Sequence, residues 1–368
     1  MEPKRILYIN GGTMHRGGIE SYMMNYYRHF DRNRLQVDFV VHGFEKGVYD
    51  DEIRSLGGKL YQVAVKSKAP LKNVLQLKEI FRKHTYKIVH SHMDAMSYVP
   101  LKIAKQCNVP VRIAHSHNTR HLTTNWIKYQ LNEQARKNLP KVATHLFACS
   151  KEAGIWLFGK GNEERFQVIP NAIDTSRFQF SNNLRDKVRR QLRISEKTIV
   201  LGHIGRFDYQ KNHAFLLEIF AELYKTNKDF CMVMVGDGEL KDEIQKCAHE
   251  LRISEGVRFV DACPNVYEYY NAFDLFLLPS HFEGLGIVLV EAQTNGLSCL
   301  ASSSVPQSSD LTGNVKFLPL KKEAWIETIL QLKITRFAAA PQKVCFAGYE
   351  INDQARKLQH IYEELLLQ

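Results

Sequence analysis

Short apolar strands alternate with helical stretches along the chain, and the alternation runs through two successive blocks. This pattern is typical of parallel sheets, because each strand needs a crossover helix that returns the chain to the same edge. We therefore expect an α/β protein with two doubly wound parallel sheets. The expected strands are residues 5–10, 36–42, 59–65, 87–92, 111–117, 144–150 and 166–170 in the first block, and 198–205, 229–237, 257–262, 275–279, 298–302 and 315–320 in the second.

The two blocks indicate a domain boundary near residue 170. With 368 residues, the chain is long enough for two domains that each bury a core. We expect a first domain over residues 1–170, a second over residues 171–350, and a terminal helix over residues 351–368, where apolar residues recur at helical spacing. Ligands of open α/β folds bind beyond the carboxyl ends of the strands, so the site should lie there.

The cysteines and the apolar runs bear on the compartment. The seven cysteines are scattered without CxxC spacing, and several lie inside apolar strands. This usage is typical of reduced core cysteines in a cytosolic protein. No apolar run approaches the length needed to span a bilayer, and we expect no secretory leader. These features predict a cytoplasmic protein.

Positive charge is concentrated in the first block. Residues 1–170 contain 27 Lys and Arg against 14 Asp and Glu, whereas residues 171–368 contain 23 against 25. The absence of a helix-turn-helix, zinc-ligand spacing or aromatic RNA-binding signature argues against a nucleic-acid partner. An anionic membrane surface is a better match, and a merely solvated basic surface is the alternative. The candidate contacts are Trp126, Lys128, Tyr129, Leu131, Arg136, Lys137 and Lys141 within residues 121–143, with Arg28, Arg32 and Arg34.

Two carboxylates follow an apolar strand of the second block. Glu283 lies on a Gly-rich turn, and Glu291 lies just inside a helix. Gly284 and Gly286 leave backbone N–H groups accessible, and the helix N-terminus favours negative charge. Because carboxylates accept hydrogen bonds from hydroxyls, the segment suits a polyhydroxylated or anionic ligand. The alternative is a solvated helix start with two unrelated glutamates.

Two cations occupy a strand-to-helix crossover earlier in the same block. Arg206 ends a strand, and Lys211 precedes the following helix. Arg binds phosphate as a planar fork and Lys as a point charge, so the pair can hold a diphosphate without a metal. A third segment, residues 236–238, places Asp237 between two glycines after a buried strand. It suits a nucleotide base packed against the end of that strand.

These three segments, in this order and at these separations, resemble the C-terminal half of the retaining GT-B glycosyltransferases of family 4. The resemblance extends to residues 168–178, which are similar to the family's domain-junction signature. It also includes the first loop, where Gly17 and Gly18 precede a helix, as in the family's loop that faces the donor phosphates. Residues 87–94 and 111–119 resemble the bacterial branch that builds exopolysaccharide or capsule.

The resemblance implies a GT-B fold, in which two Rossmann-like domains face a central cleft and a terminal helix crosses back to the first domain. It implies transfer of a sugar, with retention, from a nucleotide sugar to a glycan or lipid-linked glycan. Because donors in this family are usually UDP-sugars, the resemblance implies a UDP-sugar donor. No cofactor or metal is expected. The implied catalytic and donor-binding residues are Gly17, Gly18, His117, Arg206, Lys211, Asp237, Glu283, Gly284, Leu285, Gly286 and Glu291.

Each implied residue has a role in the transfer. Arg206 and Lys211 would neutralise the leaving diphosphate. Glu283 would orient the sugar hydroxyls, and Glu291 would bind the ribose. A lipid-linked acceptor would bring the enzyme to the inner face of the cell membrane as a peripheral protein. Ser298 stands where the family often has Pro, which leaves the sugar open.

Two HxH pairs follow expected strands in the first domain, His90 with His92 and His115 with His117. Imidazoles are common zinc ligands. Neither pair has a third Cys or carboxylate at ligand spacing, and this argues against a metal. The resemblance implies that His117 contacts the donor sugar, with His115 as the alternative. A core or acceptor-loop role is expected for His90 and His92.

Three other function classes share parts of this pattern. A dinucleotide-dependent oxidoreductase is also doubly wound, but its first turn should read GxGxxG, and residues 11–18 break that spacing. A GT-B sugar-nucleotide epimerase shares the architecture, and trapping of released nucleoside diphosphate with and without acceptor would separate it from a transferase. A non-catalytic partner subunit predicts a degraded donor site, whereas this donor site is intact in sequence.

Overall fold

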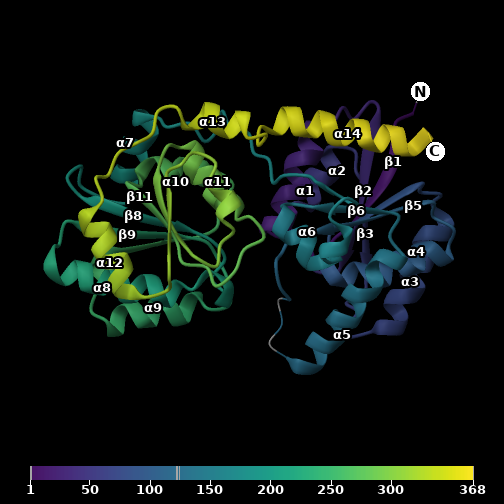
Figure 1. Cartoon of the computed structure of the whole chain (residues 1–368), viewed down its shortest axis with the longest axis horizontal. Helices are drawn as coiled ribbons and strands as arrows, with labels where there is room; N and C mark the ends of the chain where they lie inside the picture. The colour runs from purple at the N-terminus through teal and green to yellow at the C-terminus, as the bar shows by residue number, and fades with distance from the viewer. Residues whose placement is uncertain (1, 122, 124, 368) are drawn as a thin grey trace. The chain divides into compact units, whose positions relative to one another are not determined.

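The computed structural model describes residues 2–121, 123 and 125–367. The chain forms two compact units, one of Met1–Ala172 with Ile351–Gln368 and one of Ile173–Glu350 (Figure 1). The units divide two residues after the boundary expected from the sequence, and the terminal helix belongs to the first unit. Leu122 and Thr124 of the expected membrane-binding stretch lie outside the described residues.

A parallel sheet of seven strands forms the centre of the first unit, in the order β3-β2-β1-β4-β5-β6-β7. Its strands are β1 (Lys4–Ile9), β2 (Leu35–His42), β3 (Leu60–Val63), β4 (Ile88–Ser91), β5 (Val111–Ser116), β6 (His145–Ala148) and β7 (Phe166–Val168). Its α-helices are α1 (Gly18–His29), α2 (Asp50–Ser55), α3 (Pro70–Lys83), α4 (Tyr98–Gln106), α5 (Trp126–Asn138), α6 (Lys151–Phe158) and α14 (Ile351–Leu367).

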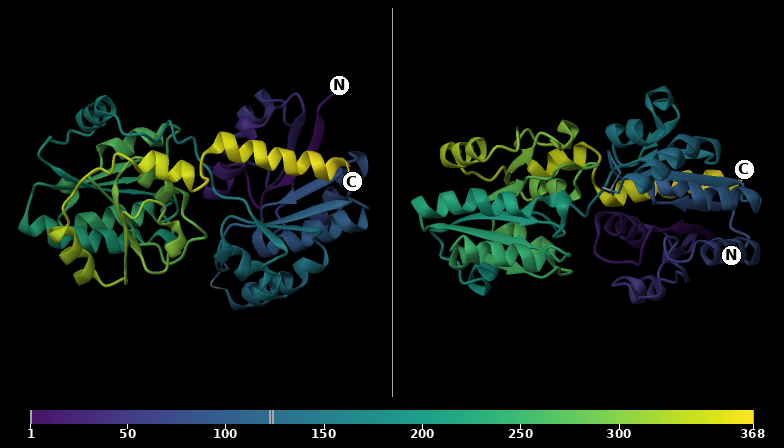
Figure 2. Two further views of the ribbon diagram at one scale, coloured as in Figure 1. Left: turned by 45° about the horizontal axis from the view of Figure 1, so that its top comes forward. Right: turned by 90° about the horizontal axis from the view of Figure 1, so that it is seen from below.

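Successive residues of the central strand β1 belong to opposite faces of this sheet. Ile6 and Tyr8 lie in a buried cluster with side chains of α1 and α14. Leu7 and Ile9 lie in a second cluster with side chains of α3, α4 and α6. Helices therefore cover both faces of the sheet, as the two views in Figure 2 show. Because both faces are buried, the strands read as nearly continuous apolar runs.

A parallel sheet of six strands forms the second unit, in the order β10-β9-β8-β11-β12-β13. Its strands are β8 (Ile199–Ile204), β9 (Phe230–Val235), β10 (Val257–Val260), β11 (Leu275–Leu278), β12 (Ser298–Ser302) and β13 (Val315–Leu318). Its α-helices are α7 (Asn182–Gln191), α8 (His213–Thr226), α9 (Lys241–Glu250), α10 (Val266–Ala272), α11 (Ile287–Thr294), α12 (Lys322–Gln331) and α13 (Ala340–Phe346). One face of this sheet packs on α8, α9 and α12.

The strand order reverses once in each sheet, between β1 and β4 in the first unit and between β8 and β11 in the second. Loops at such switch points diverge and leave space for ligands at the carboxyl ends of the strands. The two parallel sheets confirm the expected fold class. Among the described residues, no helix combines the length and apolarity that a bilayer crossing requires.

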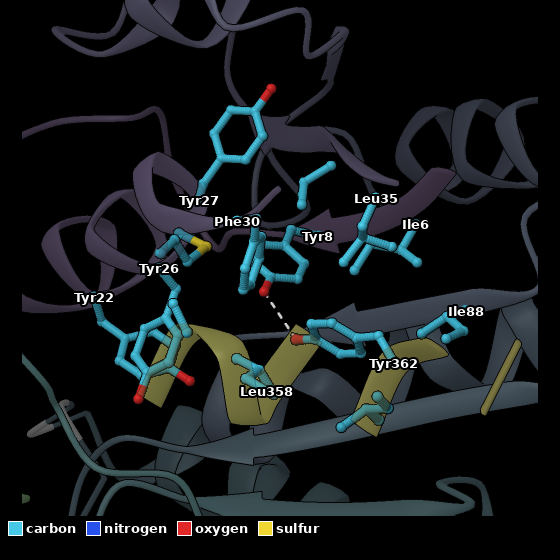
Figure 3. Packing of buried hydrophobic residues seen from close by; sticks show 14 of the residues in the cluster. Ile6, Tyr8, Tyr22, Tyr26, Tyr27, Phe30, Leu35, Ile88, Leu358 and Tyr362 are labelled. Carbon is cyan, nitrogen blue, oxygen red and sulfur yellow. Dashed lines mark hydrogen bonds between the residues drawn. The ribbon is translucent and has the colours of Figure 1, made fainter. Parts of the chain in front are cut away.

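Buried tyrosines hold α14 against the sheet of the first unit (Figure 3). The Tyr362 hydroxyl lies 2.8 Å from the Tyr8 hydroxyl and 2.6 Å from Nδ1 of His90. All three side chains are fully buried. Because buried hydroxyls and ring nitrogens need hydrogen-bond partners, these three groups satisfy one another and fix the position of α14.

We expect Tyr362→Phe to lower the free energy of unfolding by about 1–3 kcal/mol, because Tyr8 and His90 lose a buried hydrogen-bond partner. Urea denaturation followed by circular dichroism measures the change. Tyr129→Phe, on an exposed tyrosine of the same unit, is the control and should change the value by less than about 0.5 kcal/mol. Equal stability of Tyr362→Phe and wild type would show that these hydrogen bonds do not hold the helix.

Candidate active site

A buried ion pair joins the loops that follow β8 and β11 at the switch point of the second unit. Lys211 Nζ lies 2.6 Å from Glu283 Oε1, and the two side chains are 14% and 6% exposed. Ser280 Oγ donates to the same carboxylate oxygen at 2.7 Å, and Gln210 Nε2 donates to the other oxygen at 3.2 Å. With three donors the carboxylate has one orientation, so both charges are fixed at this edge of the sheet.

The local backbone positions both loops. Asp208 accepts a hydrogen bond from the backbone N–H of Lys211 at 3.2 Å and caps a short 3₁₀ turn. Gly286, which caps α11, has φ 82°, a left-handed conformation that favours glycine. The preceding Gly284 and Leu285 are buried. Leu285 as a whole is only 1% exposed, and Gly286 is buried as well, so the turn is less accessible than its glycines predicted.

Arg206 and Asp237, the other residues expected at this edge, contact partners of their own. The Arg206 guanidinium is exposed and lies 3.1 Å from Glu239. Asp237 Oδ1 accepts a hydrogen bond from Lys241 Nζ at 3.0 Å, and its Oδ2 accepts one from the backbone N–H of Ala262 at 3.1 Å. Asp237 therefore joins the loops after β9 and β10, and its role in binding a nucleotide base stays a prediction.

Glu291 lies in α11 and is buried against α10. Its Oε2 accepts a hydrogen bond of 2.6 Å from the Tyr270 hydroxyl. Burial raises the pKa of Glu291 to about 7, although the Tyr270 hydrogen bond and the positive charge of Lys211 oppose this rise. Glu291 therefore interacts electrostatically with Lys211. The second unit links two predicted carboxylates to this lysine, Glu283 by direct contact and Glu291 through its field.

Gly17 and Gly18 open helix α1, and a carboxylate of the chain lies beside them. Gly17 is the N-cap, and Gly18 is the first helical residue. A Cβ on Gly17 would lie 2.3 Å from Glu20 Oε2, while Glu20 Oε1 accepts a hydrogen bond from Asn10 Nδ2 at 2.9 Å. Since a helix N-terminus favours negative charge, Glu20 stabilises the end of α1 that was expected to face the donor phosphates.

His117 follows β5 and lies among three other buried histidines of the first unit. Its Nε2 is 3.0 Å from Nδ1 of His92, and its ring stacks on His115 with centroids 4.2 Å apart. Its backbone N–H donates to Asp94 Oδ1 at 2.6 Å. Burial lowers the pKa of His117 to about 3. His117 is therefore a neutral imidazole at physiological pH, held through both its ring and its backbone.

Sequence reasoning missed the residues that orient the two carboxylates. Ser280 and Gln210 lie close in sequence to predicted residues, and their polar side chains were the available signal. Tyr270 lies 21 positions from Glu291, on a different helix. No local pattern connects these two positions, so only the fold reveals the contact.

Comparison with known proteins agrees with this geometry. Residues 16–177 match the family model described as Glycosyltransferase Family 4, and residues 185–333 match the model described as Glycosyl transferases group 1. The Bacillus subtilis (strain 168) protein named "Putative glycosyltransferase EpsF" is 35% identical over 98% of this chain and 96% of its own length. The chain belongs to glycosyltransferase family 4.

Two further proteins are similar to this family 4 member. An Escherichia coli protein named UDP-Gal:alpha-D-GlcNAc-diphosphoundecaprenol alpha-1,3-galactosyltransferase is 24% identical over 63% of this chain and 62% of its own length. The crystal structure of Anabaena HepE in complex with UDP and glucose has a TM-score of 0.80 over 98% of this chain and 100% of that chain, at 18% identity. The matches confirm a transferase and favour it over the epimerase and the non-catalytic subunit.

Glu291→Gln tests the buried ionisation in this glycosyltransferase. The pKa of Glu291 is about 7 in the folded protein against an ordinary 4.5, so the unfolded chain loses this proton first as pH rises. The free energy of unfolding of wild type should therefore fall by about 3 kcal/mol as pH rises from 4.5 to about 7. Above pH 7 this group should cause no further loss. The variant lacks this contribution. Urea denaturation from pH 4 to pH 8 should show a growing advantage for Glu291→Gln, and a pH-independent difference would contradict the assignment.

Proposed function

We propose that the protein is a retaining glycosyltransferase that moves a sugar from a UDP-sugar to a glycan or lipid-linked glycan in exopolysaccharide or capsule biosynthesis. The observation that carries the proposal is the buried Lys211–Glu283 pair beside Glu291 at the switch point of the second sheet. The Escherichia coli relative is named for a UDP-Gal donor and a diphosphoundecaprenol acceptor, and the Anabaena structure contains UDP and glucose. Both support this donor and acceptor class.

The donor diphosphate meets a fixed positive charge in Lys211. The Lys211 side chain is 14% exposed, so its charge acts where the effective dielectric constant is lower than in water, and it stabilises developing negative charge more strongly. Arg206 lies earlier in the same loop, with its side chain 61% exposed, and adds a planar fork for the same diphosphate. Each of the two cations has a carboxylate partner, Glu283 for Lys211 and Glu239 for Arg206, and we propose that they also bind the diphosphate, without a metal.

The remaining residues bind the other parts of the donor. Glu283 and the backbone amides of its turn hold the sugar hydroxyls, Glu291 holds the ribose, and His117 contacts the sugar as a neutral imidazole. In the transfer, the acceptor hydroxyl forms a bond to the anomeric carbon as the bond from that carbon to the phosphate oxygen breaks. The departing phosphate takes the hydroxyl proton, so no protein base is required. Because the hydroxyl attacks on the face from which the phosphate leaves, the configuration is retained without a protein nucleophile.

Lys211→Met tests the donor site, because it removes the charge and keeps the aliphatic stem. We expect kcat/KM for the UDP-sugar donor to fall by about a hundredfold. Lys225→Met, the same change on a lysine 66% exposed in the same unit, should leave the rate unchanged. Release of UDP is measured for a panel of UDP-sugars, with and without a lipid-linked acceptor. Near-normal turnover by Lys211→Met would remove it from the site, and a strict need for added Mg²⁺ or Mn²⁺ would contradict metal-free diphosphate binding.

A lipid-linked acceptor requires work at a membrane, and helix α5 offers a surface for docking. Its exposed apolar side chains are Trp126, Ile127, Tyr129 and Leu131, which are 44% to 72% exposed. Ile127 was not among the contacts expected from the sequence. Lys128 and Lys137 lie on the same helix. An apolar surface with adjacent lysines suits the interface of an anionic bilayer, so we propose that α5 docks the enzyme there as a peripheral protein.

Three arginines expected in the membrane surface are held in ion pairs. The pairs are Arg28 with Glu52, Arg34 with Glu363, and Arg136 with Glu133. A carboxylate beside each guanidinium compensates its charge, so these arginines attract headgroups less than their number implies. Lys137 also lies 4.0 Å from Glu133, so Lys128 and the apolar side chains of α5 carry the docking proposal.

The double variant Trp126→Ser, Leu131→Ser tests this surface. Both side chains are exposed, so the fold should persist while binding to vesicles with anionic lipid falls by about tenfold or more. Cosedimentation with vesicles measures binding, and added salt should weaken the binding of wild type because about 0.1 M salt screens charges beyond roughly 10 Å. Leu330→Ser, on an exposed leucine of the second unit, is the control. Unchanged binding by the double variant would exclude α5 as the docking surface.

A further inference from the structure

We propose that His90, His92 and His115 form a transition-metal site in the first unit. One possible ligand atom from each residue lies within 4.8 Å of the others. The three side chains are 0%, 1% and 0% exposed. Clusters of imidazoles at this separation, shielded from water, are the ligand sets that proteins use for zinc and its neighbours in the first transition row.

Pairing between β4 and β5 creates the cluster. The two strands are parallel neighbours, and His90 lies opposite Ile113 in their register. Alternate residues of a strand share one face of the sheet, so His90 and His92 project from the same face. Because His115 lies two residues beyond Ile113, it shares the face of Ile113 and comes beside this pair. The His90–His92 pair therefore gains its missing third ligand from the next strand.

Three buried polar atoms of this region have no hydrogen-bond partner within the described part of the chain. They are Nε2 of His92, Nε2 of His115 and the hydroxyl of Tyr22. The Tyr22 ring packs on His115 with centroids 4.9 Å apart. An unpaired buried polar group costs about 1–3 kcal/mol. Three such groups around one cluster indicate that a further group binds among them.

His90 is already oriented as a ligand. Its Nδ1 lies 2.6 Å from the Tyr362 hydroxyl, and its Nε2 lies 3.1 Å from Nδ1 of His115. A ligating histidine typically bonds through its other ring nitrogen to an outer group, which fixes the ring. Two nitrogen ligands on one tetrahedral zinc ion lie about 3.4 Å apart, from bond lengths near 2.1 Å. A small displacement of the two rings therefore converts this contact into a shared ion, which would use Nδ1 of His115 and leave its unpaired Nε2 for an outer hydrogen bond.

The ligand chemistry selects the class of metal. Imidazoles bind Zn²⁺, Cu²⁺ and Ni²⁺, whereas Mg²⁺ and Ca²⁺ prefer oxygen ligands. Each imidazole presents a lone pair to such an ion in its neutral form. A water molecule or the Tyr22 oxygen completes the tetrahedron.

This site adjoins His117, whose Nε2 lies 3.0 Å from Nδ1 of His92, but it shares no residue with the proposed donor site and does not depend on the proposed function. It revises the argument from the sequence, where a third ligand was sought along the chain. The chain instead supplies that ligand across two neighbouring strands. A metal here stabilises the end of β4, to which Tyr362 of α14 is bonded.

Metal analysis of the tag-free full chain tests the proposal. After gel filtration in metal-free buffer, inductively coupled plasma mass spectrometry should find about one transition-metal ion per chain. His92→Asn should retain less than about a tenth of it. His42→Asn, which alters a buried histidine of the same unit outside the cluster, should retain all of it. Co²⁺ added to chelator-treated wild type should produce the visible absorption of a tetrahedral site.

The cobalt spectrum uses the unaltered chain, so the test holds even where His92→Asn fails to fold. Absence of bound metal, of a cobalt spectrum and of a rise in melting temperature with added Zn²⁺ would show that water fills the space, and would overturn the proposal. Equal metal content in His92→Asn and wild type, or equal loss in His42→Asn, would overturn it too. None of these readouts uses turnover, so their failure leaves the donor site untouched.

Discussion

The arrangement of the proposed donor site depends on the ion pair between Lys211 and Glu283. The pair connects the loops after two adjacent strands, β8 and β11, where the strand order of the second sheet reverses. A buried ion pair adds little net stability, because the cost of desolvation offsets the attraction, whereas loss of one partner leaves an uncompensated charge that costs about 3–5 kcal/mol. The pair is better explained by the position that it gives Lys211 than by a gain in stability, because it holds the positive charge in a fixed orientation with little exposure to water.

The fold was predictable because its signals are local. Strands buried on both faces read as apolar runs, and their alternation with helices leaves few topologies that obey the rules for parallel connections. Each sheet, of seven and six strands, contains the strands expected from the sequence. The terminal helix was also visible as an apolar stripe at helical spacing. Its attachment through Tyr362 and Tyr8 was not, because that contact joins residues 354 positions apart.

The candidate site was predictable only in its motif residues. Spacing identified Lys211, Glu283 and Glu291, but the groups that orient them come from other elements. Tyr270 reaches Glu291 from α10. The meeting of two HxH pairs likewise depends on strand register, which is set by the folded sheet. By contrast, the ion pair between Arg136 and Glu133 spans three residues of one helix. The spacing of these two residues was visible in the sequence, but the expectation of a basic surface rested on a count of charges and did not consider the pair.

The two units place different kinds of polar group at equivalent points. After the switch-point strands, the second unit presents the charges of Lys211 and Glu283, whereas the first unit has, within β4 and β5, histidines that burial keeps neutral. The first unit nevertheless carries the excess of positive charge, 27 cations against 14 anions over residues 1–170. That excess must therefore lie at its surface, where salt screens it and anionic headgroups can meet it. Burial thus separates two kinds of charge, since a few are fixed in the proposed donor site and the others lie at the surface where the proposed membrane contact would form.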